Sequence, residues 1–332
     1  MHVSILGGGG FLGRKLASRL AGDGALGGSA IASLTLFDLA APPAPAAPFP
    51  VATVGGDLVD LPPEAVPAGT DVIFHLAAVV SAQAEQDYAL GRRVNLRGTD
   101  AVVDACRGLV AEGGKPPRVV FTSSVASFSG SQETVLADDA RQVPANSYGA
   151  QKAAAELILA DACRRGFLDA VSIRLPTVIV RPGRPNRAAS SFFSAIVREP
   201  LLGLPAELPV PDAFAAWVCS PNRAVDWLLH AATMDTTRMG LDRSVNPPGI
   251  STTIAHLLQA LDEVKPGASA LVRRVEDKEI AGIVGLWPPA FEAVRAQTLG
   301  FASHEPIVDV IRAFVRDDLD ATRLERGVPA RK

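Results

Sequence analysis

The chain has 332 residues, 48% of them apolar and 20% charged, with a formal net charge of -3. This composition is that of an ordinary globular protein, and the length is enough for one large α/β domain with an added lobe. Because 32 Lys and Arg residues stand against 35 Asp and Glu, the charge indicates neither a basic surface for nucleic acid nor a polybasic membrane anchor. We therefore expect a small-molecule partner, with no nucleic acid and no membrane.

The cysteines and the N-terminus restrict the setting further. Cys106, Cys163 and Cys219 show none of the close spacings of a metal site, so no metal is predicted. The apolar run Val3–Leu6 follows the first methionine almost directly, without the charged region and cleavage site of a signal peptide. Uninterrupted apolar stretches stay well below the about 18 residues that a membrane-spanning helix needs. These features predict a cytoplasmic protein.

Short apolar runs alternate with longer helical patterns in the first half of the chain. Strands are predicted at Val3–Leu6, Ser33–Asp38, Val51–Val54, Asp71–Leu76, Arg118–Thr122 and Ala170–Leu175. Helices are predicted to begin near Phe11, near Val94 and at Tyr148. This alternation is typical of parallel strands joined by crossover helices. The predicted fold class is α/β, a doubly wound parallel sheet of the Rossmann type.

After Leu175 the composition of the chain changes, and segments containing Pro, Arg and Ser that are typical of loops dominate. Within this part, Trp217–Ala232 has the pattern of a strand followed by a helix and is expected to return to the sheet. Earlier, the five prolines of Ala40–Pro50 predict an extended surface connection rather than a domain linker. We predict a Rossmann domain of residues 1–176 plus 215–248, and a smaller discontinuous C-terminal lobe of residues 177–214 plus 249–332.

A glycine-rich turn follows the first predicted strand and opens the first helix. Glycine lets the backbone turn tightly and approach a pyrophosphate, while the helix N-terminus offers unpaired N–H groups to the anion. The spacing predicts a dinucleotide site that includes Gly7, Gly10, Phe11, Leu12 and Gly13.

Asp38 stands at the end of the strand predicted at Ser33–Asp38. A carboxylate there accepts hydrogen bonds from the adenosine ribose and repels a 2′-phosphate, and no arginine follows in Leu39–Pro43 to neutralise that phosphate. The predicted cofactor is therefore NAD rather than NADP. The structural alternative is that Asp38 only caps a loop.

Tyr148 and Lys152 lie four residues apart on a predicted helix, so their side chains share one face. A tyrosine of pKa about 10 becomes a usable base when a nearby ammonium favours its phenolate. Ser124 follows the strand predicted at Arg118–Thr122, at the sheet edge where a hydroxyl can share the substrate alcohol with that tyrosine. Taken alone, each feature has a structural alternative, a surface Tyr–Lys pair or a helix-capping serine.

Together these elements resemble the extended short-chain dehydrogenase/reductase family, the NAD-dependent epimerase/dehydratase type, from Met1 to a helix near Ile307–Leu319. Further resemblances are Gly56-Asp57-Leu58, His75-Leu76-Ala77-Ala78 and Val94-Asn95-Leu96-Arg97-Gly98-Thr99. The resemblance implies a catalytic set of Ser124, Tyr148 and Lys152. It also implies NAD contacts at Asp57, Leu58, Ala77, Ala78, Asn95, Thr122, Pro176 and Thr177, besides the catalytic Tyr148 and Lys152.

Some segments are most similar to family members that oxidise sugar acids. They are Asn146–Ala153, Arg174–Thr177 and Arg181–Asn186. Such members convert the carbon-2 alcohol of a four-carbon sugar acid into a 2-oxo acid in sugar-acid catabolism. By contrast, Ser127-Phe128-Ser129 and Val218–Arg223 depart from the nucleotide-sugar members. The resemblance thus implies an NAD-dependent dehydrogenase whose C-terminal lobe binds a sugar acid.

In the expected reaction, Tyr148 takes the proton of the carbon-2 hydroxyl while that carbon delivers hydride to NAD. Lys152 lowers the pKa of the tyrosine and reaches the nicotinamide ribose, and Ser124 orients the alcohol. A hydroxy acid also needs a partner for its carboxylate, and an arginine can hold one with two hydrogen bonds. The predicted substrate contacts are Ser81, Ser124, Tyr148, Arg181 and Asn186.

Two competing functions remain open at this point. A nucleotide-sugar epimerase or dehydratase would use the same Tyr148 and Lys152 while NAD stays tightly bound, and net NADH production separates it from a dehydrogenase. A dinucleotide sensor or scaffold would keep the fold without the chemistry. The helix from Tyr148 to Cys163 has more apolar surface than one sheet face needs. Either this helix is simply buried or it packs against a second subunit, and of the two we expect a homodimer.

Overall fold

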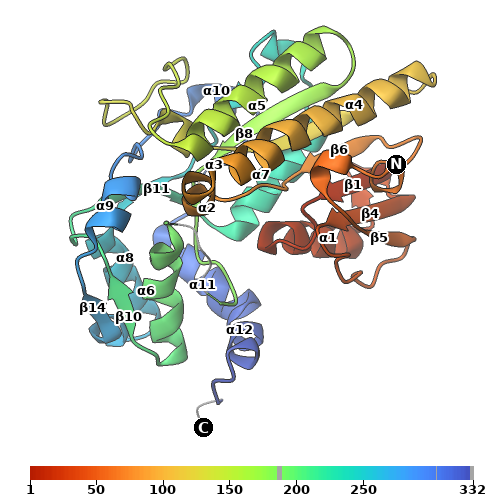
Figure 1. The fold of residues 1–332 in the computed structure, drawn as a ribbon. Coiled ribbons are helices and arrows are strands. Elements are labelled where there is room, and N and C mark those ends of the chain that lie inside the picture. The colour runs from red at the N-terminus through yellow and green to blue at the C-terminus, as the bar shows by residue number, and fades with distance from the viewer. Residues whose placement is uncertain (185–188, 304, 330–332) are drawn as a thin grey trace.

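The computed structural model describes residues 1–184, 189–303 and 305–329, and in these a parallel sheet of seven strands forms the centre (Figure 1). The strands lie in the order β12, β8, β7, β6, β1, β4, β5, and every neighbouring pair is parallel. They are β1 (His2–Leu6), β4 (Ser33–Asp38), β5 (Val51–Gly55), β6 (Val72–His75), β7 (Arg118–Ser124), β8 (Asp169–Leu175) and β12 (Ser244–Val245). The predicted doubly wound α/β fold is confirmed.

The six predicted strands are all present, and each begins and ends within two residues of its prediction. Consecutive residues of β4, β6 and β8 are buried, because helices cover both faces of the sheet. The strand β12 and the hairpin of β2 (Ala25–Leu26) and β3 (Ser29–Ala30) were not predicted. A run of two residues has no periodicity to detect.

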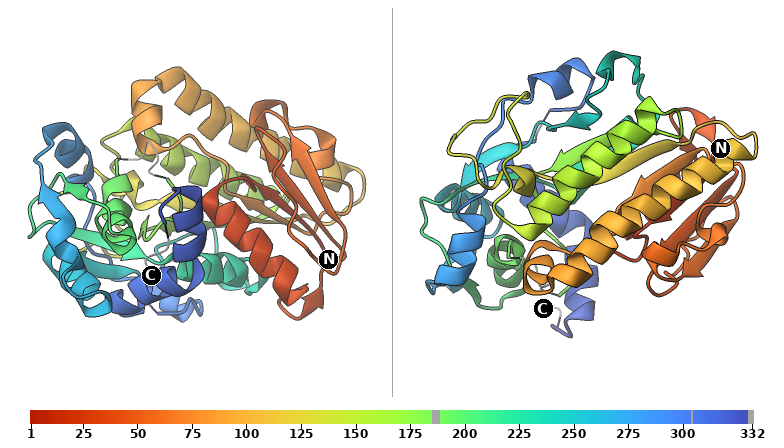
Figure 2. Two further views of the ribbon diagram at one scale, coloured as in Figure 1. Left: turned by 90° about the horizontal axis from the view of Figure 1, so that it is seen from below. Right: turned by 45° about the horizontal axis from the view of Figure 1, so that its top comes forward.

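Two helical layers sandwich the sheet. Helices α1 (Phe11–Asp23) and α7 (Pro221–Thr233) pack on one face, and α4 (Gly98–Ala111) and α5 (Ser147–Arg164) pack on the other. The right-hand view of Figure 2 shows α4 and α5 side by side. Trp227 of α7 is fully buried, and burying a large apolar side chain stabilises a fold by about 1.5–3 kcal/mol. Both layers therefore hold the strands firmly, and the carboxyl ends of the strands all meet one edge.

A smaller lobe lies next to that edge, toward the lower left of Figure 1. Its strands are β9 (Thr177–Val178), β10 (Ala206–Leu208), β11 (Ala215–Cys219), β13 (Ile250–Thr253) and β14 (Val272–Arg274). Its helices are α6 (Ser191–Leu202), α8 (Ile254–Val264), α9 (Lys278–Val284), α11 (Ile307–Asp317) and α12 (Leu319–Glu325). The lobe has a hydrophobic cluster of its own. By contrast, α10 (Val294–Thr298) contributes Ala296 to the core between the large sheet and helices α1 and α7.

One strand prediction is wrong in its partner. Trp217–Ala232 does contain a strand and a helix, but β11 does not return to the large sheet. It pairs instead with β9 and β13 in a three-stranded sheet, and the edge position beside β8 belongs to β12. The pattern of one strand shows which face is buried and not which strand lies beside it. The domain boundaries stay a prediction, since this small sheet joins segments from both predicted parts.

Two kinds of feature are absent from the residues that the structure describes. No helix there is long and apolar enough to cross a membrane. No group of three or more His, Cys, Asp or Glu side chains there could hold a metal ion.

Candidate active site

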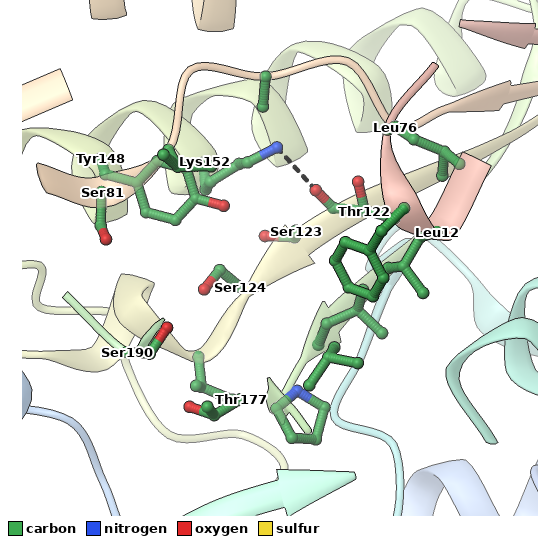
Figure 3. Close-up of a pocket in the computed structure, with 18 of the residues that line it drawn as sticks. Leu12, Leu76, Ser81, Thr122, Ser123, Ser124, Tyr148, Lys152, Thr177 and Ser190 are labelled. Atoms are coloured by element: carbon green, nitrogen blue, oxygen red, sulfur yellow. Dashed lines mark hydrogen bonds between the residues drawn. The ribbon is translucent and has the colours of Figure 1, made fainter. Parts of the chain in front are cut away.

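A cavity of about 340 Å³ opens where the carboxyl ends of β1, β6, β7 and β8 face the smaller lobe (Figure 3). Open parallel sheets bind their ligands at this edge. Many of the predicted site residues line it, namely Gly7, Gly10, Phe11, Leu12, Gly13, Ala78, Ser81, Thr122, Ser124, Tyr148, Lys152, Pro176, Thr177 and Arg181. The fold thus brings together residues that are up to 174 positions apart in the chain, from Gly7 to Arg181.

The glycine-rich turn leaves no room for side chains. A Cβ on Gly13 would lie 2.1 Å from the carbonyl oxygen of Gly7, and a Cβ on Gly7, whose φ is +95°, would lie 2.6 Å from the backbone nitrogen of Ala77. Gly10 caps α1 without a side-chain hydrogen bond, so the first N–H groups of the helix remain available to an anion. This geometry fits the diphosphate of a dinucleotide.

Asp38 ends β4 directly beside this turn. Its Oδ2 atom accepts a hydrogen bond from the backbone nitrogen of Gly9 at 2.9 Å, and Oδ1 accepts one from Leu39 at 2.8 Å. The carboxylate therefore has a fixed orientation next to the turn while each oxygen keeps a further lone pair for a ribose hydroxyl. The loop-capping alternative and the cofactor role are compatible in this arrangement.

Replacing Asp38 by asparagine is expected to lower the preference for NAD over NADP by about 10-fold or more, because the repulsion of a 2′-phosphate and a charged hydrogen bond to the ribose are both lost. Dissociation constants for NAD and NADP, measured by tryptophan fluorescence, test this. The exposed Asp60, replaced in the same way, is the control. An unchanged ratio of the two constants in the Asp38 variant would leave only the loop-capping role.

Asp57, Leu58 and Ala77 do not line the cavity, and of these Ala77 lies beside Gly7 of the turn. Asp57 caps the short helix η1 (Leu58–Asp60) by accepting from Val59, and it pairs with Arg93 at 2.6 Å. The Val59 hydrogen bond and the Arg93 guanidinium lower the pKa of Asp57. Ala77 donates its N–H to Leu6, which holds the end of β6 against the glycine turn. Their cofactor contacts stay predictions.

Asn95 lies in a π-helical turn (Arg93–Arg97) and is buried. Its side chain accepts from the Val79 nitrogen at 2.8 Å, donates to the Val79 oxygen at 3.1 Å and donates to Gln151 of α5 at 2.7 Å. It therefore fixes the loop after β6 against the helix that carries Tyr148. That loop leads into α2 (Ser81–Gln86), which is followed by α3 (Tyr88–Arg92), and Ser81 lines the cavity.

Tyr148 and Lys152 project from the first turns of α5 into the cavity. The helix begins there because Asn146 caps it, accepting from the Gly149 nitrogen at 2.7 Å. Lys152 is buried and donates from Nζ to the Thr122 carbonyl oxygen at 2.8 Å. Figure 3 shows the Tyr148 ring and the Lys152 side chain close together, with Ser123 and Ser124 below them.

Burial shifts the pKa values of both groups. It raises the pKa of Tyr148 to about 12, while the Arg181 guanidinium and a hydrogen bond with Ser124 act in the opposite direction. It lowers the pKa of Lys152 to about 7, and the Glu156 carboxylate opposes that change. The cation that lowers the pKa of Tyr148 in this structure is thus Arg181 rather than the expected Lys152.

Replacing Lys152 by methionine is expected to remove a rise in stability between about pH 7 and pH 9. The folded-state pKa of Lys152 is about 7 against an ordinary 10.5, so the unfolded chain binds more protons in this interval and raising the pH favours the folded state. Urea unfolding of both proteins across the interval measures the difference. Equal pH slopes for the wild type and the variant would contradict the shifted lysine.

Ser124 has two roles in the geometry. Its Oγ atom accepts from the Ala126 nitrogen at 3.1 Å and so caps the short helix η4 (Val125–Phe128). The same hydroxyl faces Tyr148 and lines the cavity. The capping alternative is therefore real, and it also holds the hydroxyl in the direction that catalysis needs.

Arg181 reaches the cavity from the smaller lobe. Its Nε atom donates to the Val178 oxygen and Nη2 donates to Ser190 Oγ, each at 3.1 Å. The guanidinium carbon lies 5.7 Å from the centre of the Phe11 ring. Asn186, the other predicted substrate residue of this segment, lies outside the described residues.

Some lining residues were not among the predicted site residues. Ser190 precedes α6, and Trp287 lies in the loop after α9. Ser190 lies nine positions after Arg181 in the chain, but Trp287 has no motif around it. A lining residue from a distant loop is found only when the chain is folded.

Residues 3–214 match the NAD dependent epimerase/dehydratase family. The chain belongs to this family. It is 45% identical to the D-erythronate dehydrogenase of Cupriavidus necator over 96% of this chain and 98% of that protein. It is 37% identical to the D-erythronate dehydrogenase of Haemophilus influenzae over 96% of this chain and all of that protein. Family and relatives together identify an NAD-dependent oxidoreductase.

Solved structures agree with this NAD dependent epimerase/dehydratase assignment. The nucleoside-diphosphate-sugar epimerase from Agrobacterium tumefaciens superimposes with a TM-score of 0.91 at 45% identity, over 96% of this chain and 95% of that one. An L-threonine dehydrogenase from Cupriavidus necator superimposes with a TM-score of 0.81 over 96% and 99% of the two chains. At 19% identity the second likeness shows the shared fold alone.

Proposed function

We propose that the protein oxidises the carbon-2 hydroxyl of D-erythronate to 2-dehydro-D-erythronate with NAD as the acceptor. The observation that carries the proposal is a single small cavity that combines Tyr148, Lys152 and Ser124 with the Arg181 guanidinium. Its volume of about 340 Å³ is at the low end for ligand sites, about 300–1,000 Å³, and has to hold the nicotinamide as well. The 45% identical dehydrogenase supports the same substrate.

The chemistry follows from the positions of three side chains. NAD, when bound, accepts the hydride that leaves carbon-2. Tyr148, as phenolate, takes the proton of the carbon-2 hydroxyl, and Ser124 donates a hydrogen bond to the same oxygen before and after oxidation. Lys152 is held by the Thr122 oxygen with its Nζ atom 5.7 Å from the centre of the Tyr148 ring, and it would bind the nicotinamide ribose.

The cofactor would be held along the edge of the sheet. The glycine turn would bind the diphosphate and Asp38 the adenosine ribose, as their geometry supports. The remaining residues that we assign to NAD are Asp57, Leu58, Ala77, Ala78, Asn95, Thr122, Pro176 and Thr177. Ser81 is assigned to the substrate because it lines the cavity close to Tyr148.

The deciding experiment follows NADH absorbance after mixing the purified protein with NAD and D-erythronate, with UDP-glucose and UDP-galactose in parallel. We expect stoichiometric NADH from the acid. Absence of NADH from D-erythronate, at a protein concentration that binds NAD, would overturn the proposal.

A nucleotide-sugar epimerase is the second candidate, because the Agrobacterium tumefaciens structure at 45% identity has that description. It predicts conversion between UDP-glucose and UDP-galactose without net NADH. The small cavity and the Ser127-Phe128-Ser129 segment, which differs from the nucleotide-sugar members, favour the dehydrogenase.

We also infer a homodimer that works in the cytoplasm. The adjacent helices α4 and α5 form an outer layer, and Leu157 on α5 is 71% exposed, as an interface side chain would be in one isolated subunit. The described cysteines are all unpaired thiols, which fits a reducing compartment. Sedimentation of the wild type and of Leu157→Glu tests the dimer.

A further inference from the structure

Arg181 presents a guanidinium to the catalytic cavity without an acidic partner in the described chain. Nε and Nη2 are engaged by the Val178 oxygen and Ser190 Oγ. Neither contact supplies negative charge, and the ion pairs of the described residues do not include Arg181. Its Nη1 atom therefore has both N–H groups available to a ligand.

Arg181 is half-buried at the cavity, and the three fully buried arginines of the described chain each have a carboxylate partner. Arg174 is 2.8 Å from Glu156, Arg198 is 2.7 Å from Glu199, and Arg243 pairs with Asp169. A guanidinium removed from water is costly unless a carboxylate accompanies it. Burial also lowers the pKa of Arg181. The exception lies in the catalytic cavity, so the missing negative charge is one that a ligand brings.

The surroundings of Arg181 hold it in one orientation. Ser190 and the Val178 oxygen fix one edge of the planar group, and the Phe11 ring lies 5.7 Å from its centre. Arg181 also interacts electrostatically with Tyr148. A pre-oriented guanidinium near the catalytic tyrosine can grip a planar carboxylate with directional hydrogen bonds.

We propose that Arg181 binds the carboxylate of the substrate and thereby selects the carbon-2 hydroxyl for oxidation, with Ser190 as its positioning residue. The inference rests on the proposed function. A carboxylate carbon is bonded directly to carbon-2, so fixing it places the carbon-2 hydroxyl toward Tyr148 and Ser124. The carbon-3 and carbon-4 hydroxyls lie progressively further along the chain.

The test compares D-erythronate with its uncharged amide in the wild type, Arg181→Met and Arg181→Lys. We expect the ratio of kcat/KM for the acid to that for the amide to fall by about 100-fold in Arg181→Met, because a buried carboxylate loses its charged partner. Arg181→Lys keeps the charge without the planar fork and should retain an intermediate ratio. Ser190→Ala should raise KM for the acid with little change in kcat.

The acid-to-amide ratio separates carboxylate binding from the effect of Arg181 on Tyr148, because a change in the tyrosine lowers kcat/KM for the acid and the amide alike. Arg165→Met, an exposed arginine at the far end of α5, is the control and should leave the ratio unchanged. Added guanidinium, at a concentration that does not unfold the protein, should restore acid turnover to Arg181→Ala.

Each adverse outcome has its own meaning. A wild type that does not oxidise D-erythronate overturns the proposed function. A wild type that oxidises it, with an unchanged acid-to-amide ratio in folded Arg181→Met, overturns the assignment of Arg181 alone. Where the wild type gives no measurable rate with the amide, KM for the acid and guanidinium rescue decide, and unchanged KM without rescue again overturns the assignment.

Discussion

Replacing Tyr148 by phenylalanine is expected to lower kcat for D-erythronate oxidation by about 10³-fold, within the range that a positioned acid–base group contributes. The hydroxyl faces Ser124, and the ring stays in place when only that oxygen is removed. The reacting alcohol then has to lose its proton to water. Stopped-flow or steady-state measurement of NADH absorbance at saturating NAD gives the loss in kcat.

The chain supplies a matched control for this variant. Its other tyrosine, Tyr88 on α3, is 60% exposed and does not line the cavity. Tyr88→Phe should retain full activity, and NAD binding should be nearly equal in both variants. If Tyr148→Phe kept a tenth or more of the wild-type kcat, another group would be the base.

Replacing Glu156 by alanine is expected to lower the free energy of unfolding by about 3–5 kcal/mol, the usual cost of breaking a buried ion pair. Glu156 is 3% exposed and lies two turns beyond Tyr148 on α5. It accepts hydrogen bonds from Arg174 at 2.8 Å, Ser244 at 2.9 Å and Gln142 at 3.0 Å, and from Ser123. The variant would leave the Arg174 guanidinium buried without its counter-charge. Urea unfolding measures the change.

A surface pair on the same helix provides the comparison. Asp161 and Arg164 are 2.7 Å apart and more than half exposed, so Asp161→Ala should cost only about 0.5 kcal/mol or less. The double variant Glu156→Leu with Arg174→Met should recover much of the loss, because it removes both charges. Similar losses for Glu156→Ala and Asp161→Ala would show that burial does not govern this pair.

Local features of the sequence were sufficient for the sheet and for much of the cavity. The turn requires glycine at positions 7 and 13 because it has no room for a Cβ there. The spacing of these glycines can be recognised in the sequence alone. The apolar runs of β1, β4 and β8 have the length and residue types of buried parallel strands. The four-residue spacing of Tyr148 and Lys152 puts both on one face of any helix.

Only the folded chain decided the features that join distant segments. In the folded chain β11 pairs with β9 and β13 in a small sheet, and the two-residue strand β12 takes the edge position beside β8. Folding also brought Trp287, which no motif predicted, to the cavity, and it made Arg181 the cation that acts on Tyr148. The physical reason is the same in each case. Turns, strands and helix faces follow from neighbours a few positions away, whereas strand partners, burial and the field around a charge depend on residues that only tertiary packing brings within a few ångströms.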